Sequence, residues 1–400
     1  MIKIQVSKTL QGKIRKGHPW VFHYQIQKQQ GTGNPGDLGV VYDSKNRLLA
    51  VGLYDPFSDI RLRILQTSEP VEIDAAFFRN RLRQALVLRE SIQAQGTTGY
   101  RVLNGENDGF PGLVLDRYGD TAVIKLYTLS WVSRLDTLLA MILDELKVQR
   151  CVLRLSRNVQ KTAEGRTQVR DGQVLAGSAV SEPVRFRENG LHFEADVLRG
   201  HKTGFFLDQR ENRQHIRGFS RGKRVLNVFS YSGAFSVYAF AGGCRSVMEL
   251  ESSQFAQNAS RKSLKSNFPE KFFSPPDFIQ IQGDAFQHLA ELEANGELFD
   301  LVILDPPAFA ARKNQKSAAL KAYSRLVHAG AVLTSPGGML FAASCSAHVS
   351  ATDFYDSVFR GLTTAEKQGE EIMRTGHAQD HPVTFELGAY LKGIFCRIIH

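Results

Sequence analysis

The stretch VLNVFSYSGAFS, residues 225–236, decides the fold that we expect for much of this chain. It predicts a buried strand ending at Phe229, a loop of small residues, and a helix that starts near Gly233. Backbone N–H groups at such a turn suit the polar tail of a ligand. Glu251 follows the next predicted strand, where a carboxylate can accept hydrogen bonds from ribose hydroxyls. The stretch indicates an adenosine-containing cofactor, with a turn that binds no ligand as the alternative.

Strands and helices alternate regularly from residue 224 onward. The predicted strands lie at 224–229, 246–250, 278–282, 299–304, 338–344, 371–375 and 391–399. The predicted helices lie near 233–241, 252–266, 285–294, 317–333 and 351–362. This alternation predicts an α/β Rossmann-like domain with a mostly parallel seven-stranded sheet, whose ligands bind at the carboxyl ends of the strands. Because the motif G-x-G-x-x-G is absent, a dinucleotide such as NAD is disfavoured.

The first half of the chain predicts two smaller domains. Apolar runs at 38–42, 48–54 and 60–65, separated by turn residues, indicate a small β-rich domain over 1–74. A central α+β domain follows over 75–185, with a helix capped by Asp74 and ended by Gly96, strands at 112–118, 121–128 and 151–156, and a helix over 130–147. We expect the polar stretch 157–172 to be a surface loop. Asn189-Gly190 predicts a two-residue hairpin near the start of the third domain, 186–400.

Composition narrows the class of protein. With 42% hydrophobic and 22% charged residues the chain is not disordered, and its net charge of +10 is compatible with a polyanionic partner or with a merely basic protein. The cysteines are scattered without zinc-ligand spacing, so no metal is expected. We see neither a signal peptide nor a membrane span, and expect a cytoplasmic protein.

Two motifs at predicted strand ends carry the chemistry. In LVILDPPAF, 301–309, Asp305 is followed by the stiff Pro306-Pro307 pair and by Phe309, which suits a planar base with an exocyclic amine. AASCSAHVS, 342–350, brings Cys345 to the same edge of the sheet. A thiolate that adds to carbon-6 of a pyrimidine makes carbon-5 nucleophilic enough to accept a methyl group. A lone cysteine at a strand end is usually a small buried hydrophobe, and its neighbours make this one a candidate nucleophile.

Further polar residues surround these motifs. The segment HKTGFFLDQRENR, 201–213, could provide an arginine for a cofactor carboxylate and a phenylalanine for adenine, or simply a helix start capped by Asp208. Asp284 follows the third predicted strand and could accept from an adenine amine, or cap the next helix. The remaining cysteines, which lie in apolar strands or in a Gly-rich turn, are interpreted as structural: Cys151, Cys244 and Cys396.

Taken together, these motifs resemble the bacterial S-adenosylmethionine-dependent 23S ribosomal RNA cytosine-5 methyltransferases that begin with a PUA domain. The resemblance rests on HKTGFFLDQRENR, VLNVFSYSGAFS, ELESS, LVILDPPAFA and SCSAHVS. It extends to GHPWVF at 17–22, GENDGFPGLVLDRYGD at 105–120 and YLKGIFCRII at 390–399, and so spans nearly the whole chain. Two positions depart from the commonest pattern of that family: Glu251 stands where an Asp is usual, and Ala347 where a second His is frequent.

The resemblance implies a PUA module for RNA, a central domain and a class I methyltransferase domain. It makes Cys345 the nucleophile and Asp305 the residue that orients the cytosine. The residues it assigns to S-adenosylmethionine are Phe206, Asp208, Arg210, Asn227, Tyr231, Gly233, Glu251 and Asp284. Contacts to RNA are expected from Pro307, Phe309, Lys13, Arg15 and Lys16, the last three from an N-terminal stretch of 36 residues that has six cations and no acid. The partner implied is 23S ribosomal RNA, and a homodimer stays open.

Three other functions remain as alternatives. The motif D-P-P followed by an aromatic residue also resembles enzymes that methylate a base nitrogen and need no thiol. A non-catalytic RNA-binding protein would use the PUA module alone, against which the intact cofactor motifs argue. A nicotinamide oxidoreductase explains neither Cys345 nor Asp305.

Overall fold

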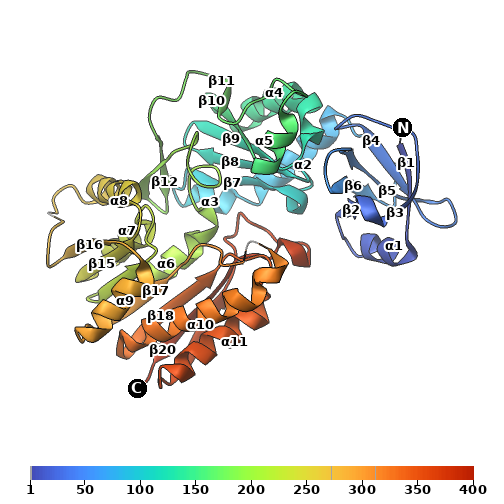
Figure 1. Ribbon diagram of the computed structural model, residues 1–400. Helices are drawn as coiled ribbons and strands as arrows, with labels where there is room; N and C mark the ends of the chain where they lie inside the picture. Colours follow the sequence, from blue (N-terminus) through green and yellow to red (C-terminus); the bar gives the residue numbers. More distant parts are fainter. Residues whose placement is uncertain (1, 272, 311) are drawn as a thin grey trace. The chain divides into compact units, whose positions relative to one another are not determined.

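The computed structural model describes residues 2–271, 273–310 and 312–400. These residues form two compact units, which Figure 1 colours along the chain. The first unit contains residues 1–190, 194–207 and 379–385, and the second contains residues 191–193, 208–378 and 386–400. Each unit is described here by itself.

The second unit is built on a seven-stranded sheet with the order β16-β15-β14-β17-β18-β20-β19. Its strands are β14 (Arg224–Val228), β15 (Ser246–Glu251), β16 (Phe278–Gln282), β17 (Phe299–Leu304), β18 (Thr334–Ser344), β19 (Gly369–Thr375) and β20 (Lys392–Ile398). β20 is antiparallel to both of its neighbours, whereas the other neighbouring pairs are parallel. The order reverses between β14 and β17, which is where open α/β sheets bind their ligands. The expected doubly wound, mostly parallel sheet is therefore confirmed.

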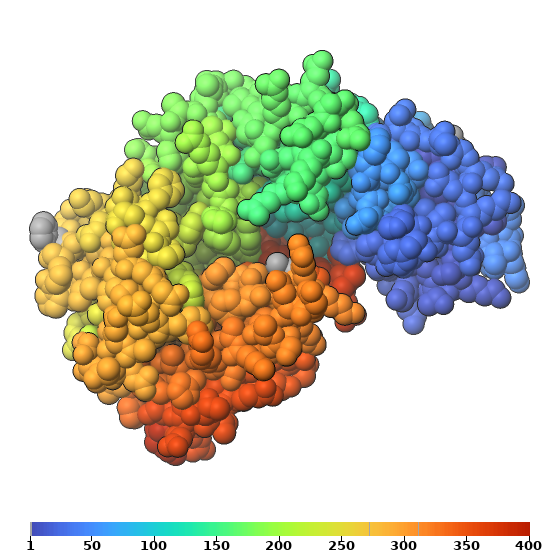
Figure 2. Space-filling model, viewed as in Figure 1, coloured from blue at the N-terminus to red at the C-terminus, as the bar shows by residue number. Residues whose placement is uncertain are grey.

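Helices cover both faces of this sheet. They are α6 (Arg210–Phe219), α7 (Ala234–Ala241), α8 (Gln254–Asn267), α9 (Ala285–Ala294), α10 (Lys316–Val332) and α11 (Ala351–Thr364). Helices α6, α7 and α8 pack on one another, as do α9, α10 and α11. Figure 2 shows residues of α10, in orange, on the surface of this unit. The central strands β14 and β17 are almost entirely buried because each is covered on both faces.

Three of these six helices, α8, α9 and α11, begin at a polar residue whose side chain caps the first turn. Ser253 accepts a hydrogen bond from the N–H of Ala256 at the start of α8, and Ser350 accepts one from Asp353 at the start of α11. Such caps satisfy backbone donors that the first turn leaves without a partner. The helix bounds expected from the sequence agree with the structure to within a few residues.

The first unit contains two sheets. The N-terminal sheet has the order β2-β6-β5-β4-β1-β3, and the second has the order β11-β10-β9-β8-β7. The strands of the N-terminal sheet are β1 (Ile2–Val6), β2 (Trp20–Phe22), β3 (Ile26–Gln30), β4 (Leu38–Tyr42), β5 (Leu48–Tyr54) and β6 (Ile60–Thr67), with helix α1 (Lys8–Arg15) between the first two. Three of these strands, β4 to β6, match the apolar runs of the sequence.

The second sheet of this unit is packed against helices over a large apolar core. Its strands are β7 (Gly99–Asn104), β8 (Leu113–Tyr118), β9 (Thr121–Leu126), β10 (Arg150–Leu155) and β11 (Gln173–Ala176), and its helices are α2 (Ala75–Val87), α3 (Glu90–Ala94), α4 (Leu135–Leu146) and α5 (Arg157–Ala163). Strands β12 (Val184–Glu188) and β13 (Leu191–Ala195) form the expected hairpin around Asn189-Gly190, both of which have positive φ. Short 3-10 turns complete the chain.

Two expectations about this region were wrong. The stretch 157–172 is not simply a loop, because it begins with α5, which Ser156 caps and which buries Val159 and Ala163. The helix that Asp74 caps does not continue to Gly96. It ends at Val87, since Arg89 is fully buried and its guanidinium forms a two-pronged ion pair with Asp108.

In the described part of the chain, no helix is both long and apolar enough to cross a lipid bilayer.

Candidate active site

The loop after β14 has an unusual backbone, which the sequence of small residues permits. Phe229, Tyr231 and Gly233 all have positive φ, and Gly233 is the N-cap of α7. A Cβ at Gly233 would collide with the Ser260 hydroxyl and lie 2.6 Å from the Cβ of Ser260. Only glycine fits this position, because both the backbone conformation and the space require it. The N–H groups of Phe229, Ser230, Tyr231 and Gly233 all donate within the fold, so this strained loop is held in a single conformation.

Glu251 stabilises this loop from the end of β15. One carboxylate oxygen accepts the N–H of Tyr231 at 2.9 Å, and the other accepts the N–H of Ser253 at 2.9 Å. The side chain is half-buried, so it is fixed in place while remaining open to a ligand on one side. The Ser252 hydroxyl also donates to the second oxygen at 3.3 Å, so the oxygen that accepts from Tyr231 is the one with a lone pair left for a further hydrogen bond.

Two buried polar atoms at the end of β14 have no hydrogen-bond partner among the described residues: Asn227 Oδ1 and Ser230 Oγ. The amide nitrogen of Asn227 donates to Ser236 at 2.9 Å, which fixes the amide orientation. Buried polar atoms without partners cost free energy, so their presence at a strand end argues for a ligand that supplies the missing hydrogen bonds. The sequence predicted that Ser230 lies in this loop, but it indicated no role for the side chain.

Glu249, two residues before Glu251, has a structural role. It is fully buried, and its carboxylate accepts hydrogen bonds from Ser260 and Gln280, both at 2.8 Å. Burial raises the pKa of this carboxyl group above its usual value. Its partners are all within the fold, so Glu251 is the better acceptor for a ligand.

Asp284 follows β16 and is exposed. Its side chain accepts the N–H of Gln287 at 3.0 Å, so it caps α9. This is the ordinary structural role that the sequence left open. A role for Asp284 toward an adenine amine remains a prediction.

The start of α6 connects two of the expected site residues to their surroundings. Asp208 is buried and accepts a hydrogen bond from the Tyr390 hydroxyl at 2.8 Å, and it is not a side-chain cap, because α6 begins after Gln209 without one. Gln209 donates to a carboxylate oxygen of Asp305 at 2.9 Å and accepts from Asn212 at 2.5 Å. The amide of Gln209 thereby fixes the orientation of Asp305. Arg210 is buried, with an ion pair to Glu211 at 2.9 Å.

Asp305 and Cys345 follow the carboxyl ends of neighbouring parallel strands. In the register of β17 and β18, Leu304 lies opposite Ala342, so the residues after each strand meet at the same edge of the sheet. Asp305 is half-buried directly after β17, and Cys345 is half-buried directly after β18. The other cysteines are buried, and burial raises the pKa of each thiol to about 12: Cys151, Cys244 and Cys396.

A hydroxyl cluster supports the segment that contains Cys345. The hydroxyl of Tyr323 on α10 binds the hydroxyls of Ser344 at 2.8 Å and Ser346 at 2.9 Å, the two residues on either side of Cys345. The ring of Phe309 lies 4.9 Å from that of Tyr323, and burial raises the pKa of the tyrosine. Sequence reasoning missed Tyr323, because nothing in the local pattern of an amphipathic helix marks a residue that binds two loop hydroxyls.

The other residues expected to contact the cofactor or RNA lie in three segments of the chain. Pro307 is exposed and Phe309 is half-buried in the loop after β17. Phe206 belongs to the first unit, where the Lys202 ammonium lies 4.8 Å from its ring centroid. On α1, Lys13 and Lys16 are exposed without an ion pair to any described carboxylate, whereas Arg15 pairs with Asp43 at 3.3 Å.

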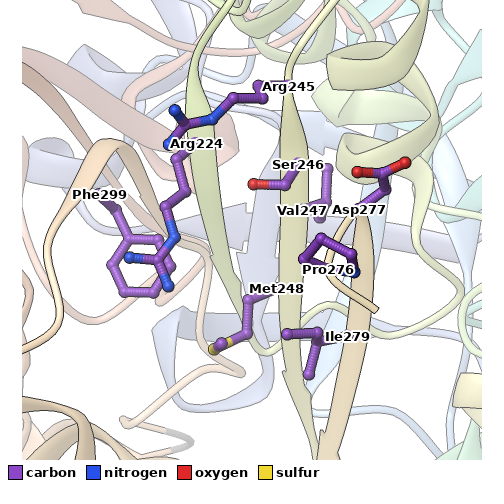
Figure 3. A pocket seen from close by; sticks show the side chains of 9 residues that line it. All are labelled: Arg224, Arg245, Ser246, Val247, Met248, Pro276, Asp277, Ile279 and Phe299. Atoms are coloured by element: carbon purple, nitrogen blue, oxygen red, sulfur yellow. The ribbon is translucent and has the colours of Figure 1, made fainter. Parts of the chain in front are cut away.

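A cavity of about 360 Å³ is located at the opposite edge of the sheet. Figure 3 shows Arg224 and Phe299 together on one side of it, with the guanidinium carbon 4.5 Å from the ring centroid, and Met248 and Ile279 on its floor. Arg224 also pairs with Glu297 at 2.6 Å. The lining of the cavity includes the first residues of β14, β15 and β17. The cavity therefore lies at the amino ends of these strands, away from the carboxyl ends that Asp305 and Cys345 follow.

Among the described residues, no group of three or more His, Cys, Asp or Glu side chains could hold a metal ion. The chemistry available at the strand ends is that of a thiol, a carboxylate held by an amide, and a loop with buried polar atoms that lack partners.

Comparisons with known proteins identify the class of protein to which this chain is similar. Residues 168–361 match the S-adenosylmethionine-dependent methyltransferase family, and residues 4–67 match the PUA-like domain family. A solved structure from Streptococcus mutans, described as a candidate S-adenosylmethionine-dependent methyltransferase, has a TM-score of 0.83 at 20% identity and covers 99% of this chain and 100% of that chain. Another, of a candidate methyltransferase complexed with S-adenosylhomocysteine, has a TM-score of 0.85 at 22% identity, with the same coverage. The fold is that of a class I methyltransferase that uses S-adenosylmethionine, preceded by a PUA-like domain.

Curated relatives narrow this class to a family. A ribosomal RNA large subunit methyltransferase from Deinococcus radiodurans is 44% identical, covering 99% of this chain and 97% of that protein. Ribosomal RNA large subunit methyltransferase I is 35% identical in Aliivibrio fischeri and 33% in Serratia proteamaculans, each covering the whole of both chains. This chain belongs to the family of S-adenosylmethionine-dependent large-subunit ribosomal RNA methyltransferases.

Proposed function

We propose that this protein methylates carbon-5 of a cytidine in 23S ribosomal RNA through a covalent bond between Cys345 and the base. One observation carries the proposal: Cys345, a half-exposed thiol, and Asp305, a carboxylate held by Gln209, follow neighbouring parallel strands at the ligand-binding edge of the sheet. A thiol is the group that carbon-5 methylation of a pyrimidine needs and that nitrogen methylation does not.

Residues at the ends of β14 and β15 fit the cofactor. Glu251 would accept hydrogen bonds from the ribose hydroxyls, and the buried Ser230 and Asn227 oxygens would gain partners from the polar tail or the ribose. Phe206, Asp208, Arg210, Tyr231, Gly233 and Asp284 complete the proposed set. When bound, S-adenosylmethionine supplies an electrophilic methyl group on a sulfonium ion.

The residues of the chain perform the other steps. The Cys345 thiolate attacks carbon-6 of the cytosine, forming an Sγ–C6 bond and making carbon-5 nucleophilic. The Asp305 carboxylate accepts a hydrogen bond from the exocyclic amine and thereby orients the ring, while Gln209 holds the carboxylate in place. After carbon-5 gains a methyl group, water or a basic group accepts the carbon-5 proton, the C5–H electrons restore the C5=C6 double bond, and the Sγ–C6 bond breaks, which releases the product and regenerates the thiolate.

Nitrogen methylation is the competing function. The loop after β17 could bind a base without any thiol. The carboxylate of Asp305 would accept from the amine, and the half-buried ring of Phe309 would pack on the base, with Pro306 and Pro307 between them. A Cys345→Ala variant separates the two, because only carbon-5 methylation requires the sulfur.

The test uses Cys345→Ala and RNA that contains 5-fluorocytidine. We expect Cys345→Ala to lose methyl transfer while keeping its affinity for S-adenosylmethionine, since the thiol acts on the base. The wild type should form a covalent adduct with the fluorinated RNA, because fluorine blocks the proton loss that releases the enzyme. An active Cys345→Ala variant together with no adduct would refute the thiol mechanism and favour nitrogen methylation.

We also propose a division of the chain into three domains. We propose a PUA-like RNA-binding domain over 1–74, a central α+β domain over 75–185 and a methyltransferase domain over 186–400. Lys13, Arg15 and Lys16 would contact phosphates, with Arg15 shared between RNA and Asp43. A ribosomal RNA substrate implies work in the cytoplasm, where ribosomes are assembled. A homodimer stays an untested prediction.

A further inference from the structure

Lys392 is a buried cation that no step described so far uses. It is the first residue of β20, and it lies opposite Ser344 in the antiparallel register with β18, next to Cys345. Only 4% of the residue is exposed. Its ammonium group donates to the carbonyl oxygens of Ser346 at 2.7 Å, Val349 at 2.8 Å and Tyr390 at 2.9 Å. All three ammonium hydrogens therefore have acceptors, and two of those acceptors belong to the segment just after Cys345.

The charge of Lys392 is not neutralised by an acid. Within the described ranges, no carboxylate forms an ion pair with this ammonium group. A buried charge without a counterion is expensive, and a neutral donor could have bound the same carbonyls at lower cost. Burial lowers the pKa of Lys392 to about 8, and the negative charge of a Cys345 thiolate opposes that shift. The cation that remains at neutral pH is bound by three carbonyl oxygens, and ionisation of the thiol gives it an oppositely charged partner.

We propose that Lys392 is a positioning residue for Cys345, which holds the 345–349 segment by its carbonyls and supplies the positive charge that stabilises the thiolate. The interaction is reciprocal, because a thiolate that favours the ammonium form must itself be favoured by it. The inference rests on the proposed role of Cys345 as nucleophile. It assigns to Lys392 the positive potential that a thiol, with an ordinary pKa of about 8.5, needs in order to react at neutral pH.

Other titratable groups lie near this pair, and the carboxylate of Asp305, at the same edge of the sheet, opposes ionisation of the thiol, so the charge of Lys392 acts against it. Tyr323 on α10 is coupled to Cys345, but its raised pKa keeps it neutral at physiological pH. His377 accepts the backbone N–H of Leu391 at 3.1 Å, and His348 is exposed in the segment after Cys345. Among the described titratable groups, Cys345 is the one whose charge is coupled to Lys392.

The test measures the rate at which iodoacetamide alkylates Cys345 between about pH 6 and pH 10 in the full-length protein, without RNA or cofactor. Peptide mass spectrometry follows the Cys345 peptide, and Cys345→Ser provides the blank. The buried thiols do not interfere, because their pKa values are raised to about 12.

We expect the wild-type rate to reach half its maximum well below pH 8.5. Lys392→Met and Lys392→Gln should move this midpoint upward by about one pH unit, so that alkylation at pH 7 slows by about tenfold. Lys392→Gln keeps hydrogen-bond donors for the carbonyls, and Lys392→Arg keeps the charge, so the arginine variant should retain the wild-type midpoint. Lys321→Met is the matched control: it removes an ammonium group from an exposed position of α10, and its midpoint should not move.

Wild-type midpoints in folded Lys392→Met or Lys392→Gln would overturn the proposal, as would a wild-type midpoint at or above about 8.5, the ordinary value. Thermal melting and S-adenosylmethionine affinity verify that each variant is folded, and the wild-type midpoint decides the matter if neither neutral variant folds. Because alkylation requires no methyl transfer, the result is independent of the proposed function. A shifted midpoint with a methylating Cys345→Ala variant would refute the nucleophile but leave the coupling in place.

Discussion

At the scale of single residues, the proposed cofactor end of the site depends on a few residues, each with a role that no neighbour duplicates. Glu251 fixes the loop after β14 through the N–H of Tyr231 and the start of α8 through the N–H of Ser253, and one of its oxygens keeps a lone pair for a ligand. Glu249, two residues earlier on the same strand, accepts hydrogen bonds from Ser260 and Gln280 within the fold. Gly233 occupies a position that no other residue fits.

Glu251→Ala should weaken S-adenosylmethionine binding by at least about tenfold, a change of about 1.4 kcal/mol. The physical reason is the loss of hydrogen bonds to a charged acceptor, each worth about 1.5–3 kcal/mol. Calorimetry measures the affinity, and Glu293→Ala, a change at an exposed glutamate of α9, is the control. Unchanged affinity in Glu251→Ala would mean that another group binds the ribose.

Gly233→Ala should destabilise the second unit and abolish cofactor binding. A left-handed backbone costs a residue with a Cβ about 1–2 kcal/mol, and here the Cβ also collides with Ser260. Gly222→Ala is a matched control, because Gly222 has a similar φ of +70° against +72°, and its Cβ would meet nothing within 4 Å. Thermal melting of both variants separates the two costs, and equal losses of stability would show that the collision with Ser260 is relieved without consequence.

At the scale of helices and strands, the sequence predicted the second unit well because its signals are local. Apolar strands, small-residue turns and polar caps recur at regular intervals from β14 to β20, and the sheet order brings their carboxyl ends together. Asp305 and Cys345 could be assigned to one edge from this pattern alone. The helix α5 was missed because its polar sequence buries only Val159 and Ala163.

Contacts between distant elements could not be predicted in the same way. Tyr323 is one buried aromatic residue among many, and Lys392 follows a leucine at the start of an apolar strand. Apart from the carbonyl of Tyr390, which is two residues from Lys392, their partners are backbone carbonyls and serine hydroxyls that lie between 21 and 46 residues away in the chain. Gln209, which orients Asp305, is separated from it by 96 residues. Only the fold brings these groups together.

Helix α10 and the ends of β17 and β18 should act as one element through Tyr323. Tyr323→Phe removes two hydrogen bonds from the serines on either side of Cys345, and should lower stability by about 1–3 kcal/mol because the buried Ser344 hydroxyl loses the acceptor for its hydrogen. Methyl transfer should fall while S-adenosylmethionine affinity is kept. Denaturant unfolding, a transfer assay and calorimetry test this, and wild-type transfer would show that Cys345 needs no such support.

At the scale of the whole molecule, the first unit joins the N-terminal sheet, which we propose binds RNA, to the sheet formed by β7 to β11. Arg63 of β6 pairs with the nearly buried carboxylate of Glu106 at 2.8 Å, and the Trp20 indole donates to the same carboxylate at 2.7 Å. Thr128 donates to Asp55 at 2.6 Å. These contacts connect the N-terminal sheet to the second sheet of the unit, so the cations of α1 are best tested by substitution within the intact chain.

Lys13→Gln combined with Lys16→Gln should weaken RNA binding and flatten its salt dependence. Each phosphate contact to a single strand contributes a slope of about −0.7, so the loss of two should reduce the slope by about 1.4. The affinity for S-adenosylmethionine should not change. RNA affinity is measured at several salt concentrations, with Lys45→Gln combined with Lys147→Gln as a control of equal charge. Parallel salt plots of equal affinity for both double variants would show that α1 does not contact RNA.

The central claim is that this methyltransferase places a methyl group on carbon-5 of a cytidine in 23S ribosomal RNA by way of Cys345. Mass-spectrometric mapping of methylated nucleosides tests it most directly, in ribosomal RNA from cells that lack the protein and cells that carry the wild type or Cys345→Ala. We predict one 5-methylcytidine in 23S ribosomal RNA that is present with the wild type and absent in the other two. A base methylated on nitrogen instead, or the same 5-methylcytidine with Cys345→Ala, would contradict the account.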